Sequence, residues 1–241
     1  MDNGMVGALA LMGVFFLATF IQGATGFGSA LVAMPLLISL LGLDVAAPLF
    51  ALQLLIVESL MIAHYRKSLS LKDIRPLVIG TLLGTGVGIL IVDYLNQEVV
   101  LTGLGVFILA YVGYVVLNMR PMPLRGVGWA YGFGFIAGAL NGAYNTAGPP
   151  YVVYGQSQAW APVVFKTNLQ TLFLLAIIFV IGGHLLVGNY TATVLEAAVI
   201  ALPGSLLGMV AGISLDRYIR PEAFNRVVLV VLFLIGLNLL R

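Results

Sequence analysis

Two short polar segments rich in glycine interrupt long apolar stretches of the chain, at residues 22–29 and at residues 141–150. Their hydrogen-bonding side chains carry no charge: Gln22, Thr25 and Ser29 in the first segment, and Asn141, Tyr144, Asn145 and Thr146 in the second. A neutral lining of amides and hydroxyls suits an oxyanion that must bind and then leave. The chemistry expected of these residues is therefore reversible anion binding.

A helix is expected to begin directly after each break, at Ser29 and at Gly148-Pro149-Pro150. Proline suits the first helical turn because its missing N–H needs no partner there. Helix N-termini expose unpaired N–H groups and a partial positive charge of roughly +0.5, which favours anions. An alternative is that Gln22 and Asn141 only satisfy backbone groups freed by the broken helices. The glycines at the breaks would let a ligand approach the backbone, and they are Gly23, Gly26, Gly28, Gly142 and Gly148.

Further polar residues open the apolar segment that follows the second break, namely Lys166, Asn168 and Gln170. Lys166 and Gln170 are four residues apart and share a helix face, whereas Asn168 points elsewhere. Lys166 either attracts an anion from the cytoplasm or extends its ammonium group to the membrane interface. Gln53 is the expected counterpart of Gln170 in the first half. These four residues complete the candidate substrate-binding set.

Glu58 is the acidic residue deep inside an apolar segment, between Asp44 and His64. An ionisable group at that depth is a functional hypothesis in itself. Glu58 either carries a coupling proton or is the satisfied partner of a donor elsewhere. The two histidines, His64 and His184, are expected near the ends of separate helices and do not form a metal site. No nucleophile–base pair or phosphate-binding loop motif occurs, so neither a cofactor nor an enzymatic activity is expected.

Composition places the chain in a membrane. Apolar residues make up 61% and charged residues 8% of the sequence, against roughly one quarter charged in a soluble domain. The net charge of +2 gives no reason to expect nucleic acid as a partner. The absence of cysteine excludes disulfides and thiol chemistry. The expected partners are the lipid bilayer, a small anion and, as a candidate coupling ion, the proton.

Ten apolar segments are expected to form helices. Two of them, residues 29–42 and 149–155, would reach only ~21 Å and ~10 Å, less than the ~30 Å hydrocarbon core. Both are therefore expected to be half-helices that follow the breaks. The other segments are residues 5–22, 47–64, 76–92, 99–118, 127–141, 163–187, 192–215 and 223–240.

The sequence contains an internal duplication. Residues 80–98, with glycines at 80, 84 and 88, align without gaps on residues 204–222, with glycines at 204, 208 and 212. Glycines four residues apart are typical of closely packed membrane helices. The chain is therefore interpreted as one all-α membrane domain with repeats at residues 1–120 and 121–241. Each repeat would contain a broken helical hairpin and three transmembrane helices, about eight predicted spans in all.

The basic residues predict how the repeats are oriented. They cluster in three loops, which are expected to be cytoplasmic. The connections near residues 93–98 and 184–191 have no lysine or arginine and are expected outside. The number of times the chain must cross the membrane between these loops requires each break to be a turn-back. The second repeat is then inverted relative to the first, and both termini are expected outside. The three loops contain Arg66, Lys67, Lys72 and Arg75; Arg120 and Arg125; and Arg217, Arg220 and Arg226.

With its paired breaks and the segment Phe165-Lys166-Thr167-Asn168-Leu169-Gln170, the chain resembles the sulfite exporter TauE/SafE family, also called the toluenesulfonate uptake permeases. The stretch from Gly138 to Pro150 looks most specific to it. The resemblance covers nearly the whole chain and implies a small membrane transporter for sulfite, organosulfonates or related organic anions. It implies functional roles for Gly23, Gly26, Gly28, Gly142, Asn145, Gly148, Pro149, Asn168 and Gln170. The second break has Asn145 and Ala147 where the first has Gly26 and Gly28, so the site is not expected to be fully symmetric.

These observations predict a secondary transporter of small sulfur-containing anions, which works by alternating access around the two hairpin tips in a cell membrane. An anion channel would use the same tips as a filter. A partner-dependent assembly subunit would neither bind nor move an anion by itself. The three alternatives differ in saturable exchange, which only the carrier is expected to show.

Overall fold

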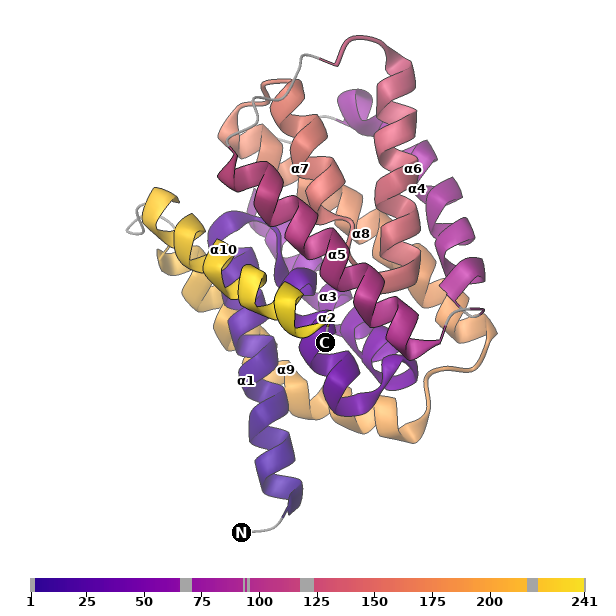
Figure 1. Cartoon of the computed structure of the whole chain (residues 1–241), viewed down its shortest axis with the longest axis vertical. Helices are drawn as coiled ribbons and strands as arrows, with labels where there is room; N and C mark the ends of the chain where they lie inside the picture. Colours follow the sequence, from indigo (N-terminus) through magenta and orange to yellow (C-terminus); the bar gives the residue numbers. More distant parts are fainter. Residues whose placement is uncertain are drawn as a thin grey trace.

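Ten helices account for the described part of the chain, which covers residues 3–65, 71–92, 94, 96–117, 124–215 and 221–240 of the computed structural model (Figure 1). Each helix falls on one of the ten apolar segments expected from the sequence. The helices are α1 (Asn3–Thr25), α2 (Ser29–Leu41), α3 (Leu43–Tyr65), α4 (Leu71–Val92), α5 (Gln97–Val116), α6 (Val127–Tyr144), α7 (Gly148–Ser157), α8 (Pro162–Leu186), α9 (Ala192–Leu215) and α10 (Pro221–Asn238).

Within the described part of the chain, five helices are long and apolar enough to cross a membrane: the apolar parts of α1, α3, α4, α8 and α9. Shorter apolar helices accompany them, including α2 and the apolar part of α5. This pattern is that of a multi-pass membrane protein. It follows from the composition, because a helix that is apolar on all sides is stable either inside a core or in lipid.

The two helices that follow the breaks are short, as the sequence predicts. Helix α2 has 13 residues and α7 has 10, so they extend only ~20 Å and ~15 Å. Each follows a turn of three residues, at 26–28 and at 145–147, after a longer helix with which it packs. The long helices α1 and α6 therefore end at the turns, and α2 and α7 begin there.

Close helix pairs join the two halves of the chain. Figure 1 shows α1 beside α9 on one side of the molecule, α4 beside α6 on another, and α5 beside α10 at the front. Glycine permits the first two contacts, because a Cβ atom on Gly84 would lie 2.0 Å from the carbonyl oxygen of Phe135, and one on Gly208 would lie 2.2 Å from that of Phe16. Glycines one helical turn away on either side lie equally close to the backbone of the facing helix. They are Gly80 and Gly88 on α4 and Gly204 and Gly212 on α9.

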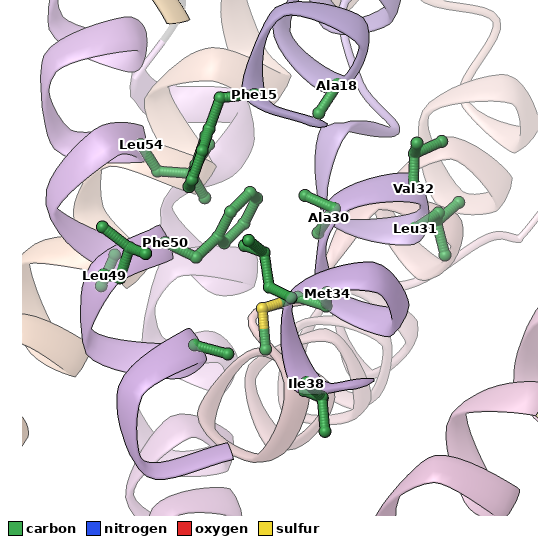
Figure 2. Close-up of a cluster of buried hydrophobic side chains, with 14 of the residues drawn as sticks. Phe15, Ala18, Ala30, Leu31, Val32, Met34, Ile38, Leu49, Phe50 and Leu54 are labelled. Carbon is green, nitrogen blue, oxygen red and sulfur yellow. The ribbon is translucent and has the colours of Figure 1, made fainter. Parts of the chain in front are cut away.

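An apolar core fixes the first break in place. Figure 2 shows side chains from α1, α2 and α3 converging around Phe50, whose ring lies 6.1 Å from that of Phe15 between centroids. Met34 of α2 contributes to the same cluster from the opposite side. Leu31 lies on the side of α2 that faces away from Phe50 (Figure 2). Burial of this cluster therefore sets the rotation of α2 about its axis. This rotation determines which way the side chains next to the first break are oriented.

The loops that predict membrane orientation lie largely outside the described residues. Residues 66–70, 118–123 and 216–220 are among those that the structure does not describe. Arg75 and Arg125 are described, and both are exposed. The assignment of these loops to the cytoplasm and of the termini to the outside stays a prediction.

Candidate substrate-binding site

Both breaks border one small cavity, here called the tip cavity. Its volume is about 20 Å³, and a cavity needs about 10–15 Å³ to hold one water molecule. In this conformation the tip cavity therefore has room for about one water and not for an oxyanion with four or more non-hydrogen atoms. Its lining comes from both halves of the chain: Gln22, Gly28, Ser29, Ala30, Leu31, Leu54 and Glu58 from the first, and Asn141, Asn145, Thr146, Ala147, Gly148 and Phe173 from the second.

A chain of hydrogen bonds links the first break to α3. The Ser29 hydroxyl donates to Oε1 of Gln22, and Nε2 of Gln22 donates to Oε1 of Glu58. All three side chains are at most 3% exposed. The second carboxyl oxygen of Glu58, Oε2, has no hydrogen-bond partner. Glu58 therefore belongs to the tip cavity and keeps one oxygen available to a proton or a ligand.

The second break contributes two buried amides that are only partly satisfied. Nδ2 of Asn145 donates to the carbonyl oxygen of Ala47 over 3.1 Å, while its Oδ1 has no partner. Nδ2 of Asn141 also has no partner. Buried polar atoms are usually hydrogen-bonded, so unpaired ones that border a cavity are candidates for contact with water or a ligand. The tip cavity thus combines a free donor on Asn141 with free acceptors on Asn145 and Glu58.

The backbone enters the turn in the same way at both breaks. Gly26 N–H donates to the carbonyl oxygen of Gln22 over 2.7 Å, and Asn145 N–H donates to that of Asn141 over 2.8 Å. Both Gly26 and Asn145 have positive φ, of 87° and 53°. Asparagine is among the few residues besides glycine that adopt this conformation readily. Asn145 therefore replaces Gly26 in the same backbone role and adds an amide side chain to the cavity.

The N-terminus of α2 is better suited to an anion than that of α7. No side chain caps α2, and its first residues, from Ser29 to Leu31, line the tip cavity. Their N–H groups lack intrahelical partners. Helix α7 is also uncapped, but Pro149 and Pro150 remove two of its first N–H groups. The anion-binding donors expected from helix N-termini are thus concentrated at the first break.

Two residues of α8 lie next to the first break without lining the tip cavity. Nε2 of Gln170 donates to the carbonyl oxygen of Gly26 over 2.6 Å. The aliphatic part of Lys166 packs on the same turn, since a Cβ atom on Gly26 would lie 3.2 Å from its Cγ. Both residues contact the turn from outside the tip cavity. The hydrogen bond from Gln170 links the second half of the chain to the hairpin tip of the first.

Other candidates from the sequence lie elsewhere. Nε2 of Gln53 donates to the carbonyl oxygen of Ala198, and its Oε1 accepts a hydrogen bond from Ser205, so Gln53 joins α3 to α9. Asn168 is fully buried, and neither of its amide atoms has a partner. Neither residue is among those that line the tip cavity. Gln53 therefore differs from Gln170, its expected counterpart, in what it contacts.

The remaining candidates shape the hairpins. Thr25 uses its hydroxyl within its own turn, donating to the carbonyl oxygens of Ile21 and Phe27. Gly23 packs against α9 and Gly142 against α4, where a Cβ atom would come within 2.8 Å of Met209 O and 2.4 Å of Thr85 O. Pro149 is buried in the first turn of α7. The side chain of Tyr144 lies outside the described residues.

Sequence reasoning did not identify the apolar part of the lining, formed by residues such as Leu31, Leu54 and Phe173. Leu54 precedes Glu58 by four residues and so shares its helix face, which is a signal that the sequence contains. Leu31 and Phe173 have no such signal, because their positions depend on how α2 and α8 are rotated in the fold. Among the described residues, no group of three histidine or acidic side chains is placed to hold a metal ion.

Comparison with known proteins places the chain in a family. Residues 11–239 match the model of the family described as sulfite exporter TauE/SafE. The chain is 26% identical over 244 residues to the "Probable sulfite/organosulfonate exporter TauE" of Cupriavidus necator, covering 98% of this chain and 93% of that protein. It is 27% identical over 179 residues to the "Probable inner membrane transporter protein TsaS" of Comamonas testosteroni, covering 71% of this chain and 74% of that protein. No solved structure matches it significantly. Since the match to the family model extends over nearly its whole length, the chain belongs to the sulfite exporter TauE/SafE family.

Proposed function

We propose that the chain is a secondary transporter that moves a small sulfur-containing anion, such as sulfite or an organosulfonate, across the cell membrane by alternating access. The observation that carries the proposal is the tip cavity, where unpartnered polar atoms from both halves of the chain border one buried space. Two relatives named as a sulfite/organosulfonate exporter and an inner membrane transporter support the same class of solute. The family consists of transporters and not enzymes.

The anion would bind against the uncapped N-terminus of α2, with the unpartnered Nδ2 of Asn141 as a further donor. Each of these groups is neutral, so binding would be moderate and reversible. The positive end of the α2 dipole favours a negative charge at this position. A passive channel is less compatible with the cavity, since a space for about one water does not provide a continuous ion path in this conformation.

Glu58 would couple proton movement to anion movement. An ionised carboxylate in the tip cavity repels a bound anion by about 4 kcal/mol at ~4 Å and an effective dielectric constant of ~20. That is about a thousandfold in affinity. A protonated Glu58 removes this repulsion and offers a donor from Oε2. The anion and a proton on Glu58 would therefore bind together, and affinity for the anion would increase as the pH falls.

Access from the two membrane faces would alternate through movement of the hairpins. The tip cavity must expand before an oxyanion can enter. We propose that residues 1–120 and 121–241 form inverted repeats with both termini outside, so that equivalent movements open the site to opposite faces. The matched glycine contacts of α4 with α6 and of α9 with α1 support two related units.

Counterflow in proteoliposomes containing only this protein tests the proposal. Labelled sulfite outside would be exchanged against internal unlabelled sulfite, a sulfonate, a carboxylate or chloride. We expect saturable exchange with the sulfur oxyanions and little with chloride. A folded protein that exchanges none of these anions would overturn the carrier, and large single-channel currents would replace it with a pore.

A further inference from the structure

The described residues form a second, larger pocket beside the tip cavity, here called the side pocket. Its volume is about 150 Å³, and an apolar protein cavity of about 150 Å³ binds benzene. The walls come from α1, α2 and the turn between them, and from α5, α7, α8 and α10. The pocket therefore has the size and lining for an apolar group of about six carbon atoms.

The side pocket adjoins the tip cavity directly. Gly28 and Leu31 line both spaces. Gly28 has a φ of 97°, and a Cβ atom there would point toward Ile21, which also lines the side pocket. These two residues therefore lie between the two spaces, and the other end of a molecule with its charged end at the N-terminus of α2 would reach the side pocket past them.

The lining of the side pocket is chemically different from that of the tip cavity. Aromatic and aliphatic side chains dominate it, including Phe27 and Tyr111, whose rings are in edge-to-face contact with centroids 6.3 Å apart. The hydroxyl of Thr25, one of its few polar groups, is already bonded to the backbone of its own turn. Gln156 also lines the pocket, and its side chain is exposed. The rest of the lining offers mainly apolar contact, so the pocket suits the uncharged part of a ligand and not a second anion.

We propose that the side pocket binds the organic group of a sulfonate whose anionic end occupies the tip cavity, and that Val115 and Leu229 limit the size of that group. The inference rests on the proposed function. Val115 lies on α5 and Leu229 on α10, opposite the break, and both are partly buried. Sulfite has no organic group and would use the tip cavity alone. The two residues therefore determine selectivity among sulfonates without contacting the anionic end.

Val115→Phe tests the proposal by filling the side pocket. The matched control is Val116→Phe, the same change at the neighbouring residue, which is 65% exposed and does not line the pocket. Counterflow of labelled sulfite would be measured with benzenesulfonate as competitor, in vesicles of one fixed lipid composition. In Val115→Phe we expect benzenesulfonate to compete at least about tenfold more weakly, because a hydrophobic pocket discriminates by such factors. Sulfite exchange should change by less than about twofold, and Val116→Phe should match the wild type.

Leu229→Ala is an independent test, because it enlarges the side pocket instead of filling it. The control is Leu234→Ala, the same change at an exposed residue of the same helix. Enlarging the pocket should let naphthalenesulfonate compete better than in the wild type, and Leu234→Ala should not. The inference is overturned if benzenesulfonate fails to compete in a wild type that exchanges sulfite, if Val115→Phe weakens both ligands equally, or if Leu229→Ala brings no gain. A wild type that exchanges no sulfur anion would overturn the proposed function itself.

Discussion

Gln170 on α8 donates a hydrogen bond of 2.6 Å to the carbonyl oxygen of Gly26, and so connects the second half of the chain to the hairpin tip of the first. This carbonyl lies in the turn at residues 26–28, where the chain leaves α1. A carbonyl freed by a broken helix needs a partner because lipid supplies none. The position of the first tip thus depends on a residue about 140 positions later in the sequence.

Gln170→Leu should reduce anion affinity more than it reduces stability. Hydrogen bonds between membrane helices contribute about 0.6 kcal/mol on average and up to about 1.7 kcal/mol, so thermal unfolding in detergent should shift only slightly. Release of the Gly26 turn should lower sulfite affinity by about tenfold or more. The matched control is Gln53→Leu, which breaks buried hydrogen bonds between α3 and α9 but none at the tip cavity. Equal losses of sulfite affinity in the two variants would contradict the role of Gln170 in positioning the first tip.

Substitutions of Asn145 should separate its backbone role from its side-chain role. Asn145→Gly keeps the positive φ without strain, whereas Asn145→Ala forces alanine into a conformation that costs about 1–2 kcal/mol. Both variants lack the amide that lines the tip cavity. Both variants also lose the hydrogen bond from Nδ2 to the carbonyl oxygen of Ala47, so both should be less stable than the wild type. Anion affinity should fall in both, while Asn145→Ala should be less stable than Asn145→Gly by about 1 kcal/mol. Binding titrations and thermal unfolding would measure the two effects, and wild-type affinity in Asn145→Gly would remove this amide from the site.

Glu58→Gln should abolish the pH dependence of anion binding. The wild type should bind sulfur anions more tightly as the pH falls, because protonation of Glu58 removes the repulsion between two negative charges. Glutamine keeps an oxygen that can accept the hydrogen bond from Gln22 but cannot ionise. Glu196→Gln on α9, where the carboxyl group is exposed, is the control and should keep the wild-type profile. Benzenesulfonate is a suitable ligand since it stays fully ionised over the range tested. A Glu58→Gln protein with unchanged pH dependence would exclude this residue as the proton carrier.

Two glycines of α4 should respond in opposite ways to the same substitution. In Gly84→Ala the new Cβ atom would lie 2.0 Å from the carbonyl oxygen of Phe135, so α4 and α6 must move apart. Such overpacking costs about 1–3 kcal/mol. Gly86 has no atom within 4 Å of its Cβ position, and alanine there should gain up to about 1 kcal/mol from helix propensity. Thermal unfolding of both variants in one detergent would measure the difference. Equal stability would mean that the helix pair is packed less closely than described.

Much of the helical framework could be predicted from the sequence. The ten apolar segments correspond to ten helices, and the two short ones correspond to α2 and α7, because length and hydropathy alone determine these features. The resemblance to the TauE/SafE family is confirmed by the match over residues 11–239. The breaks were visible because glycine, proline and amides are rare together in apolar sequence.

The lining of the site was harder to predict because it depends on how each helix is rotated. Gln22 and Asn141 were found through the paired breaks, and both border the tip cavity. Gln53 was chosen through its correspondence with Gln170, but sequence alignment does not say which neighbour a side chain contacts. The pairing of Gln22 with Glu58 joins residues 36 positions apart on different helices. The packing of both α1 and α3 on α2 and α9 brings them together.

The unlike construction of the two tips has a consequence for kinetics on the two membrane faces. The first tip has Gly28 at a φ of 97° and the donor-rich start of α2, whereas the second has Ala147 at a φ of −89° and two prolines. In the proposed carrier, tips that differ in donor number would give different half-saturation concentrations for the anion on the two membrane faces. Gradients still fix the net direction of movement, but loading from one face would saturate before loading from the other, which makes the carrier kinetically polarised.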